Sequence, residues 1–424
     1  MDVGPFRENR DFRLLLIGGT VFYLGGMMTY VAIPFQIYQL THSNFAVGAI
    51  GLVELVPLIV FGLYGGALAD HVDRRLLLVW TGVAQAAFTA WLAVNAFSDH
   101  PRLWEIFVVS GLLASSSALQ RPSREALVPR TVRHDELTAA NALSSFGMQA
   151  GVLVGPTIGG LIVASAGVGW CFLIDIIGLL VASAMYAAMR RYPHVGETEA
   201  PSLSGIVTGL RYALGRRDLL GTYAVDLAAM LLAMPVVLFP ALASQVFGQP
   251  HLLGLLYTAE TVGAIVATAL SGWTGRVFRH GRAIVLAAAL YGVCIALAGW
   301  APTIWLAVLF FALAGAADMI SAVFRGTIWN QTIPDNLRGR LAGIEMLSYS
   351  IGPLGGQVRA GVVADRWTVR GSIVSGGAAC VGGVALTAIW LHDFWRYDAR
   401  TDEHAQAERH RRQPQQQSVD RAES

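Results

Sequence analysis

The chain has 424 residues, of which 54% are hydrophobic and only 14% are charged. Soluble domains carry about 25% charged residues, so this composition argues against a soluble enzyme. All 30 basic residues are arginine. Without lysine there is no phosphate-binding loop of the form Gly-x-x-x-x-Gly-Lys-[Ser/Thr], so this chain does not itself hydrolyse ATP through such a loop.

Long apolar runs fill most of the chain, and a helix needs about 20 such residues to cross a membrane. Spanning strands would instead show about ten alternating residues each, so the spans are predicted to be helices. We expect an all-α membrane protein with twelve transmembrane helices. They are predicted at 12–40, 45–69, 75–97, 103–121, 137–165, 168–189, 219–247, 252–274, 282–300, 303–331, 338–364 and 371–394.

The arginines indicate how the spans are oriented. Twelve spans place both termini on one side of the membrane. If that side is the cytoplasm, the inner segments hold 25 of the 30 arginines and the outer loops hold three, namely Arg102, Arg366 and Arg370. Cytoplasmic loops carry an excess of basic residues, so we expect both termini to be cytoplasmic.

The longest connection, 190–218, divides the spans into two groups of six. Apolar residues at helical spacing within it predict a short amphipathic helix on the inner membrane surface. The tail is polar and rich in charge and glutamine, a composition typical of disorder. The predicted parts are an N-terminal six-helix bundle (1–189), a cytoplasmic linker (190–218), a C-terminal six-helix bundle (219–395) and a disordered cytoplasmic tail (396–424).

The two halves of the chain repeat at a nearly constant offset. Four pairs of identical residues are separated by 206 positions: Pro34 and Pro240, Gly48 and Gly254, Glu54 and Glu260, and Gly66 and Gly272. Gly155-Pro156 and Gly352-Pro353 are separated by 197 positions. Two parallel six-helix repeats are the arrangement of major facilitator transporters, so we predict that fold, with a pseudo-two-fold relation between its halves.

The stretch GGALADHVDRRLLL, 65–78, follows the second predicted span. It resembles the inner-loop signature of the major facilitator superfamily at five positions: Gly66, Leu68, Asp70, Arg74 and Arg75. His71 and Asp73 depart from the family pattern, which usually has a basic residue and a glycine there.

This resemblance implies that the inner loop holds the inner ends of the two halves together. Asp70 would accept hydrogen bonds from a helix N-terminus, where an anion is favoured, and the expected partner is the segment 336–339. A charged turn that only sets topology is the alternative. The corresponding place in the second half has Arg276 where Asp70 stands, so that copy lacks the acid.

The stretch GVLVGPTIGG, 151–160, resembles the fifth-span signature of major facilitator drug:proton antiporters, which are exporters. Its residues are Gly151, Gly155, Pro156, Gly159 and Gly160. Three of the glycines are spaced by four, so they line one helix face and allow another backbone to approach closely. The proline bends the helix. Such a face suits a helix that moves against the opposite half, and ordinary helix packing is the alternative.

A wider resemblance, to the enterobactin-exporter branch of the superfamily, covers nearly the whole chain. It is carried by the stretches at 31–70, 239–248, 252–264 and 337–356. It implies proton-linked efflux of a siderophore, drug or antibiotic-like molecule from the bacterial inner membrane by a monomer. No cofactor, metal or nucleic acid is expected. An importer, a lipid flippase and a membrane sensor without transport are the alternatives.

Ionisable residues inside spans cost about 2.5–3.5 kcal/mol at mid-bilayer and are functional candidates by default. The deepest acids are Glu54, Glu260 and Asp318, which are the candidates for proton coupling. As repeat mates, the two glutamates should face each other. The candidates for substrate binding are Arg325, Asp226 and Asp175. A structural ion pair, such as Asp318 with Arg325 two turns further along one helix, is the alternative reading.

Overall fold

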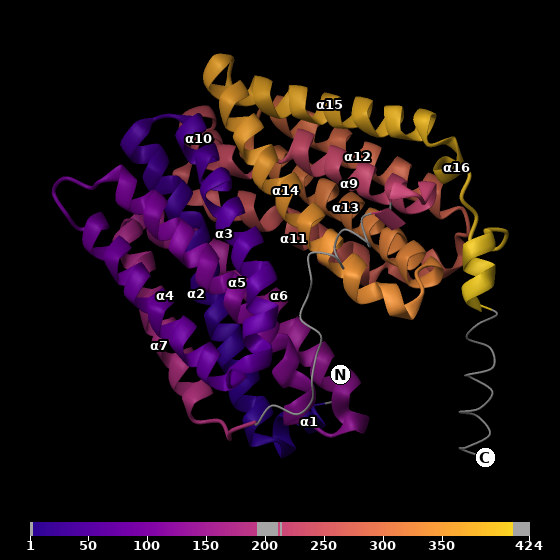
Figure 1. Cartoon of the computed structure of the whole chain (residues 1–424). Coiled ribbons are helices and arrows are strands. Elements are labelled where there is room, and N and C mark those ends of the chain that lie inside the picture. The colour runs from indigo at the N-terminus through magenta and orange to yellow at the C-terminus, as the bar shows by residue number, and fades with distance from the viewer. Residues whose placement is uncertain (1–2, 193–210, 213, 410–424) are drawn as a thin grey trace. The chain divides into compact units, whose positions relative to one another are not determined.

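The computed structural model of the chain describes residues 3–192, 211–212 and 214–409, and it describes no side chains at 63–71 and 335–349. Every regular element in the described part is a helix (Figure 1). The first repeat contains α2 Arg10–Thr41, α3 Asn44–His71, α4 Arg74–Ala96, α5 Leu103–Thr131, α6 Leu137–Ser165 and α7 Val168–Ala187. The second contains α9 Arg217–Ala233, α11 Leu253–Ala269, α12 His280–Trp300, α13 Ile304–Thr332, α14 Asp335–Arg366 and α15 Val369–Trp390.

The transmembrane prediction agrees with these helices. In the described part of the chain, 11 helices are long and apolar enough to cross a membrane. The remaining predicted span coincides with α14, a helix of 32 residues. One helix is longer than predicted, since α5 continues to Thr131 through Pro122 and Pro129. Hydropathy marks where the apolar segment stops, and a helix can continue into polar sequence beyond it.

The seventh span is interrupted. We predicted one continuous helix over 219–247, but α9 stops at Ala233 and Met234 takes an extended conformation with ψ of 112°. Met234 precedes Pro235, and a residue before proline is driven out of the helical region. The chain continues as a 3-10 turn (Val236–Leu238), the short helix α10 (Phe239–Ala241) and a π-helical turn (Leu242–Val246).

The chain divides into two compact units. Unit 1 consists of Met1–Pro201, Val236–Thr261 and Gln357–Val369, and unit 2 consists of Ser202–Pro235, Val262–Gly356 and Arg370–Ser424. Unit 1 therefore combines the first repeat with two segments of the second repeat. The α11 and α14 helices each contribute to both units, so the compact units do not coincide with the two halves predicted from the repeat.

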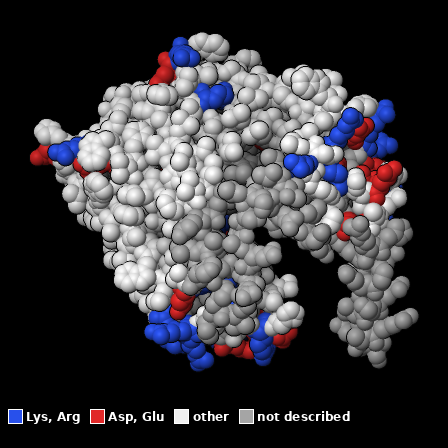
Figure 2. Space-filling view, viewed as in Figure 1, with Lys and Arg blue, Asp and Glu red and all other residues white. Residues whose placement is uncertain are grey.

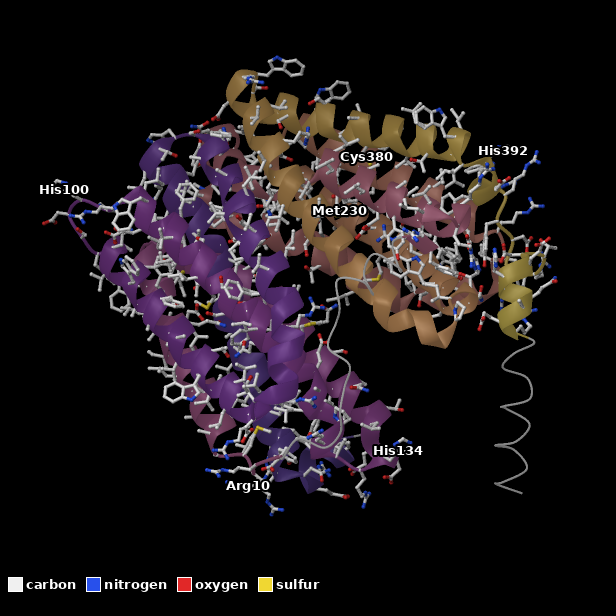
Figure 3. All side chains as sticks on the ribbon, viewed as in Figure 1. Arg10, His100, His134, Met230, Cys380 and His392 are labelled. Atoms are coloured by element: carbon white, nitrogen blue, oxygen red, sulfur yellow. The ribbon has the colours of Figure 1, made fainter. Side chains whose placement is uncertain are left out.

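Unit 1 has polar ends and apolar sides. Arg10 and His134 lie at one end, next to the short helix α1 (Gly4–Glu8), and His100 lies at the opposite end (Figure 3). Charged side chains gather at these ends and are scarce between them on the visible face (Figure 2). A buried cluster that includes Phe12, Leu78, Leu127 and Tyr186 forms the core near the Arg10 end. This distribution is the one expected of helices that cross a bilayer.

Unit 2 contains more of the C-terminal segment than predicted. We expected disorder from residue 396, but Tyr397, Ala399 and Ala405 are buried. The Ala399 amide donates a hydrogen bond of 2.9 Å to the Phe278 carbonyl, and residues 403–409 are helical. Together with Phe394 of the short helix α16 (His392–Trp395), these apolar side chains anchor the segment. Residues 410–424 lie outside the described part of the chain.

Candidate functional site

In unit 1 the structure brings the two repeat-related glutamates to one tyrosine. Tyr30 of α2 interacts electrostatically with both Glu54 of α3 and Glu260 of α11. The Tyr30 ring also meets the ring of Tyr257 edge-on, with 5.8 Å between their centroids. The sequence predicted that the glutamates would approach each other, but it did not single out Tyr30. A lone tyrosine in an apolar span carries no signal that separates it from ordinary packing residues.

Asp175 of α7 lies in the interface between α7 and α2. Its side chain accepts a hydrogen bond of 2.5 Å from the Thr29 hydroxyl, and the residue is only 3% exposed. Gly25 makes room for it, because a side chain at Gly25 would collide with the carboxyl group. Polar contacts of this kind hold membrane helices together. The geometry therefore favours helix packing over substrate binding for Asp175.

In unit 2, Arg325 of α13 lies between two acids. Its Nη1 atom is 2.5 Å from Asp226 Oδ1 on α9, and its Nη2 atom is 3.6 Å from Asp318 Oδ1. The side chains of Arg325 and Asp226 are 3% and 5% exposed, whereas that of Asp318 is 34% exposed. The sequence placed Asp318 and Arg325 on one helix face, but it did not indicate that Asp226 is the closer partner.

The charges of this triad depend on one proton. With both acids ionised the triad carries a net charge of −1, and with a proton on Asp318 it is neutral. A buried net charge is costly in a membrane, while a close ion pair is tolerated. Arg325 and Asp226 form the close buried pair, and Asp318 is the more distant and more exposed acid of the three.

The glycine face of α6 packs on α2. A Cβ atom on Gly151 would lie 2.7 Å from Tyr23 Cβ, one on Gly155 would lie 2.7 Å from Met27 Cβ, and one on Gly159 would lie 3.0 Å from Met28 Cα. We expected this face to meet the opposite half of the molecule. The structure corrects that expectation, since the three glycines bring α6 close to a helix of their own repeat.

Gly160 and Pro156 instead meet a segment of the second repeat within unit 1. A Cβ atom on Gly160 would lie 2.7 Å from Gly254 Cα, and one on Gly254 would lie 2.6 Å from the Pro156 carbonyl. The two backbones of α6 and α11 therefore touch without intervening side chains. This contact lies near the end of unit 1 at which α2 stops and α3 begins, the far end from Arg10.

A second close approach at the far end is related to the first by the repeat. A Cβ atom on Gly48 of α3 would lie 2.6 Å from the Gln357 carbonyl of α14. The offset of 206 carries Gly48 to Gly254, and the offset of 197 carries Gly160 to Gln357. The α3–α14 and α6–α11 contacts therefore occupy equivalent places in the two repeats.

Asp365, at the end of α14, caps the start of α3. Its carboxylate accepts four hydrogen bonds: from Ser43 Oγ (2.6 Å), the Asn44 amide (2.8 Å), Asn44 Nδ2 (3.0 Å) and the Phe45 amide (2.9 Å). Ser43 Oγ in turn accepts a hydrogen bond of 3.2 Å from the Ala46 amide. The first amides of α3, which no intrahelical carbonyl can satisfy, are thereby all bonded.

Ionised Asp365 suits this position. Partial burial by itself would raise the pKa of the Asp365 carboxyl, but the hydrogen bonds from Ser43, Phe45 and Asn44 lower it below its ordinary value. The positive end of the α3 helix dipole also favours an anion here. Sequence reasoning missed Asp365, because Ser43 reads as a local helix cap and nothing in the sequence points to a partner more than 300 residues away.

Comparison with known proteins identifies the family. A family model described as a transmembrane secretion effector matches residues 2–420. The chain belongs to this family of major facilitator transporters. The enterobactin exporter EntS of Escherichia coli O1:K1 / APEC is 26% identical over 392 residues, which cover 92% of this chain and 94% of that protein. EntS of Salmonella typhi is 26% identical over 393 residues, with the same coverage.

Solved structures share the fold of this secretion effector. A POT family transporter in complex with a thioalcohol-conjugated peptide matches with a TM-score of 0.71 and 11% identity, over 91% of this chain and 96% of that chain. The nucleoside transporter NupG matches with a TM-score of 0.68 and 12% identity, over 91% and 98%. The predicted major facilitator fold is confirmed. The secretion effector is a multi-pass membrane transporter and not an enzyme.

The inner-loop signature of the secretion effector is described only in part. Asp73 accepts a hydrogen bond of 3.0 Å from the Arg75 amide and so caps α4, and Arg75 Nη1 donates a hydrogen bond of 2.8 Å to the Met189 carbonyl. Gly66 and Asp70 lie in the part of α3 without described side chains, and so does the expected partner segment 336–339 in α14. The contact expected between Asp70 and that segment stays a prediction.

Proposed function

We propose that this secretion effector exports a small amphipathic molecule, such as a siderophore, drug or antibiotic-like compound, across the bacterial inner membrane by proton antiport. It acts as a monomer with both termini in the cytoplasm. The exported class and the direction are supported by similarity to enterobactin exporters over 92% of the chain and by the antiporter signature at 151–160.

The observation that carries the mechanism is the pair of repeat-related contacts at the far end of unit 1. Segments of the second repeat close on the first repeat there through the Gly160–Gly254 and Gly48–Gln357 approaches. In the proposed orientation this end faces away from the cytoplasm. Alternating access then requires both contacts to separate when cargo leaves and to re-form before the next cargo binds.

The proton pathway in this proposal uses two sets of acids. Asp318 takes up a proton and neutralises the triad with Arg325 and Asp226. Glu54 and Glu260 each interact electrostatically with Tyr30, so the second set of acids lies around one tyrosine. A transported proton therefore couples to cargo through the charge of either set.

The experiment is efflux of a fluorescent dye from energised cells, with a protonophore as the test of coupling. We expect efflux to fall at least about tenfold in Asp318→Asn, Glu54→Gln or Glu260→Gln, the size of one lost coupling interaction of about 1.4 kcal/mol. The matched control is Asp393→Asn, because Asp393 is exposed and pairs with Arg217 at the surface.

Two outcomes would overturn the proposal. Gradient-driven efflux that survives in the triple variant Asp318→Asn, Glu54→Gln, Glu260→Gln would exclude these acids from coupling. Accumulation of the compound inside energised cells would identify an importer, and binding without flux would identify a sensor.

A further inference from the structure

A cavity of about 300 Å³ opens at the start of α12 in unit 2. Its walls come from the 3-10 turn Ser271–Arg276, the start of α12, the last turns of α13 and the C-terminal segment. Among the lining residues are Gly275, His280, Gln331, Arg400 and Arg409. The volume is at the lower end of the range for small-molecule sites. None of the proposed transport residues lines this cavity.

Two residues that line the cavity each have a buried acceptor atom without a hydrogen-bond partner in the described structure. His280 is 4% exposed, and its Nε2 atom lies 3.0 Å from the Val277 carbonyl oxygen. A carbonyl only accepts, so Nε2 carries the hydrogen and Nδ1 is left as an acceptor. Nδ1 and the Gln331 Oε1 atom are both unpartnered. Buried acceptors are rarely left without a donor, which points to a ligand that carries hydroxyl groups.

The same cavity has positive charge at its wall. Arg400 lies over the Phe278 ring at 4.0 Å from the centroid and places its Nε atom 3.5 Å from Asp398. Arg409 donates a hydrogen bond of 3.4 Å to the Ala399 carbonyl. α12 begins at His280, so the positive end of its helix dipole lies at the cavity. Guanidinium groups with a helix N-terminus form a setting that binds phosphate.

The cavity lies where a transmembrane helix begins. Trp273 and Phe278, on the segment that forms its wall, are 45% and 38% exposed. Exposed aromatic side chains at the end of a spanning helix are typical of the membrane–water interface. A phosphate in this cavity would therefore be at the depth of a lipid headgroup.

We propose that the cavity binds a phosphate ester that carries hydroxyl groups, with the phosphate at Arg400 and Arg409 and the hydroxyls at His280 and Gln331. An anionic phospholipid with a glycerol headgroup has this chemistry, and so has a soluble sugar or glycerol phosphate. The ligand stabilises the packing of the C-terminal segment on α12 and α13, because it bonds to residues of each.

The experiment measures phospholipid binding to the purified full-length protein in detergent by native mass spectrometry and by thermal unfolding. Phosphatidylglycerol is compared with phosphatidylcholine of the same chains, and glycerol 3-phosphate is added in a separate arm. The deciding variant is Gly275→Leu, which adds bulk at the cavity wall without changing charge, since Gly275 lines the cavity and a Cβ atom there meets open space. Its matched control is Gly272→Leu, in the same turn and also in open space.

We expect phosphatidylglycerol to bind at least about tenfold more tightly than phosphatidylcholine, the size of one charge-assisted hydrogen bond. Gly275→Leu and Arg400→Gln should remove this preference, and Gly272→Leu and Arg396→Gln should retain it. Competition by glycerol 3-phosphate would identify a soluble phosphate ester as the ligand, and its failure to compete would identify the lipid. Equal binding by Gly275→Leu and Gly272→Leu, or no preference for phosphatidylglycerol, would overturn the proposal.

Discussion

The α6–α11 and α3–α14 contacts of unit 1 occupy equivalent places in the two repeats, but they are built differently. The first is a contact of bare backbone, in which Gly160 meets Gly254. The second combines a similar approach, of Gly48 to Gln357, with the hydrogen bonds that Asp365 accepts at the start of α3. The corresponding end of α6, residues 162–166, contains no acidic residue.

This difference shows how two equivalent contacts in one molecule can open with different ease. Separation of α6 from α11 costs packing, which is short-ranged and depends on how closely the backbones approach. Separation of α3 from α14 also exposes a carboxylate and the first amides of a helix, which must then find water. The opening of the α3–α14 contact should therefore depend on the charge of Asp365 and on access of water to it.

The largest effect on transport should follow substitution at the α6–α11 contact, where backbone meets backbone. In Gly254→Leu the new Cβ atom would meet backbone atoms of Pro156 and Thr157 at 2.6 and 2.7 Å, and backbone cannot yield as a side chain can. Overpacking of this kind costs about 1–3 kcal/mol, so the closed far end should be disfavoured by roughly 5-fold to 150-fold. Dye efflux should fall accordingly.

The matched control for Gly254→Leu is Gly382→Leu on α15, where a Cβ atom meets open space. Both variants should insert in the membrane and unfold at similar temperatures. Efflux by Gly254→Leu at the rate of Gly382→Leu would show that the α6–α11 approach has no part in transport.

A smaller effect on the opening of the far end is expected from substitution at the α3–α14 contact, which Asp365 caps. Asp365→Ala removes the acceptor for three consecutive residues, and loss of a helix cap costs about 0.5–2 kcal/mol. The far end should open more often, which a distance measurement between spin labels at His100 and Trp367 would detect, since both side chains are exposed. An unchanged distance distribution relative to Asp393→Ala would contradict the assigned role of the cap.

The smallest effect concerns pH. Because the hydrogen bonds lower the pKa of Asp365, the capped contact is fully present above the ordinary aspartate pKa of about 4 and is lost as pH falls through the lowered value. Asp365 therefore stays ionised between pH 7 and pH 5, and it is not the residue that senses the coupling proton. Any change in the label distances over this range should be equal in the native chain and in Asp365→Asn. A change that Asp365→Asn abolishes would contradict this.

Much of the fold could be predicted from the sequence, because a bilayer demands long apolar helices and the repeat offset carries one half onto the other. The offset also related Glu54 to Glu260, both of which interact with Tyr30. The sequence could not show that Arg325 pairs more closely with Asp226 than with Asp318, because helical spacing relates residues on one helix only. For the same reason the sequence could not show that Asp365 caps α3, or that the glycine face of α6 packs on α2. Both features depend on how separate helices pack.

The cap at Asp365 also allows opening of the far end to be followed by hydrogen exchange of backbone amides. The amides of Asn44 and Phe45 are protected through a side chain of α14 and by no carbonyl of their own helix. Their exchange with deuterated water therefore follows separation of α3 from α14, and not fraying within α3. Two backbone amides in the native sequence thus record, without any label or substitution, how often this end of the transporter opens.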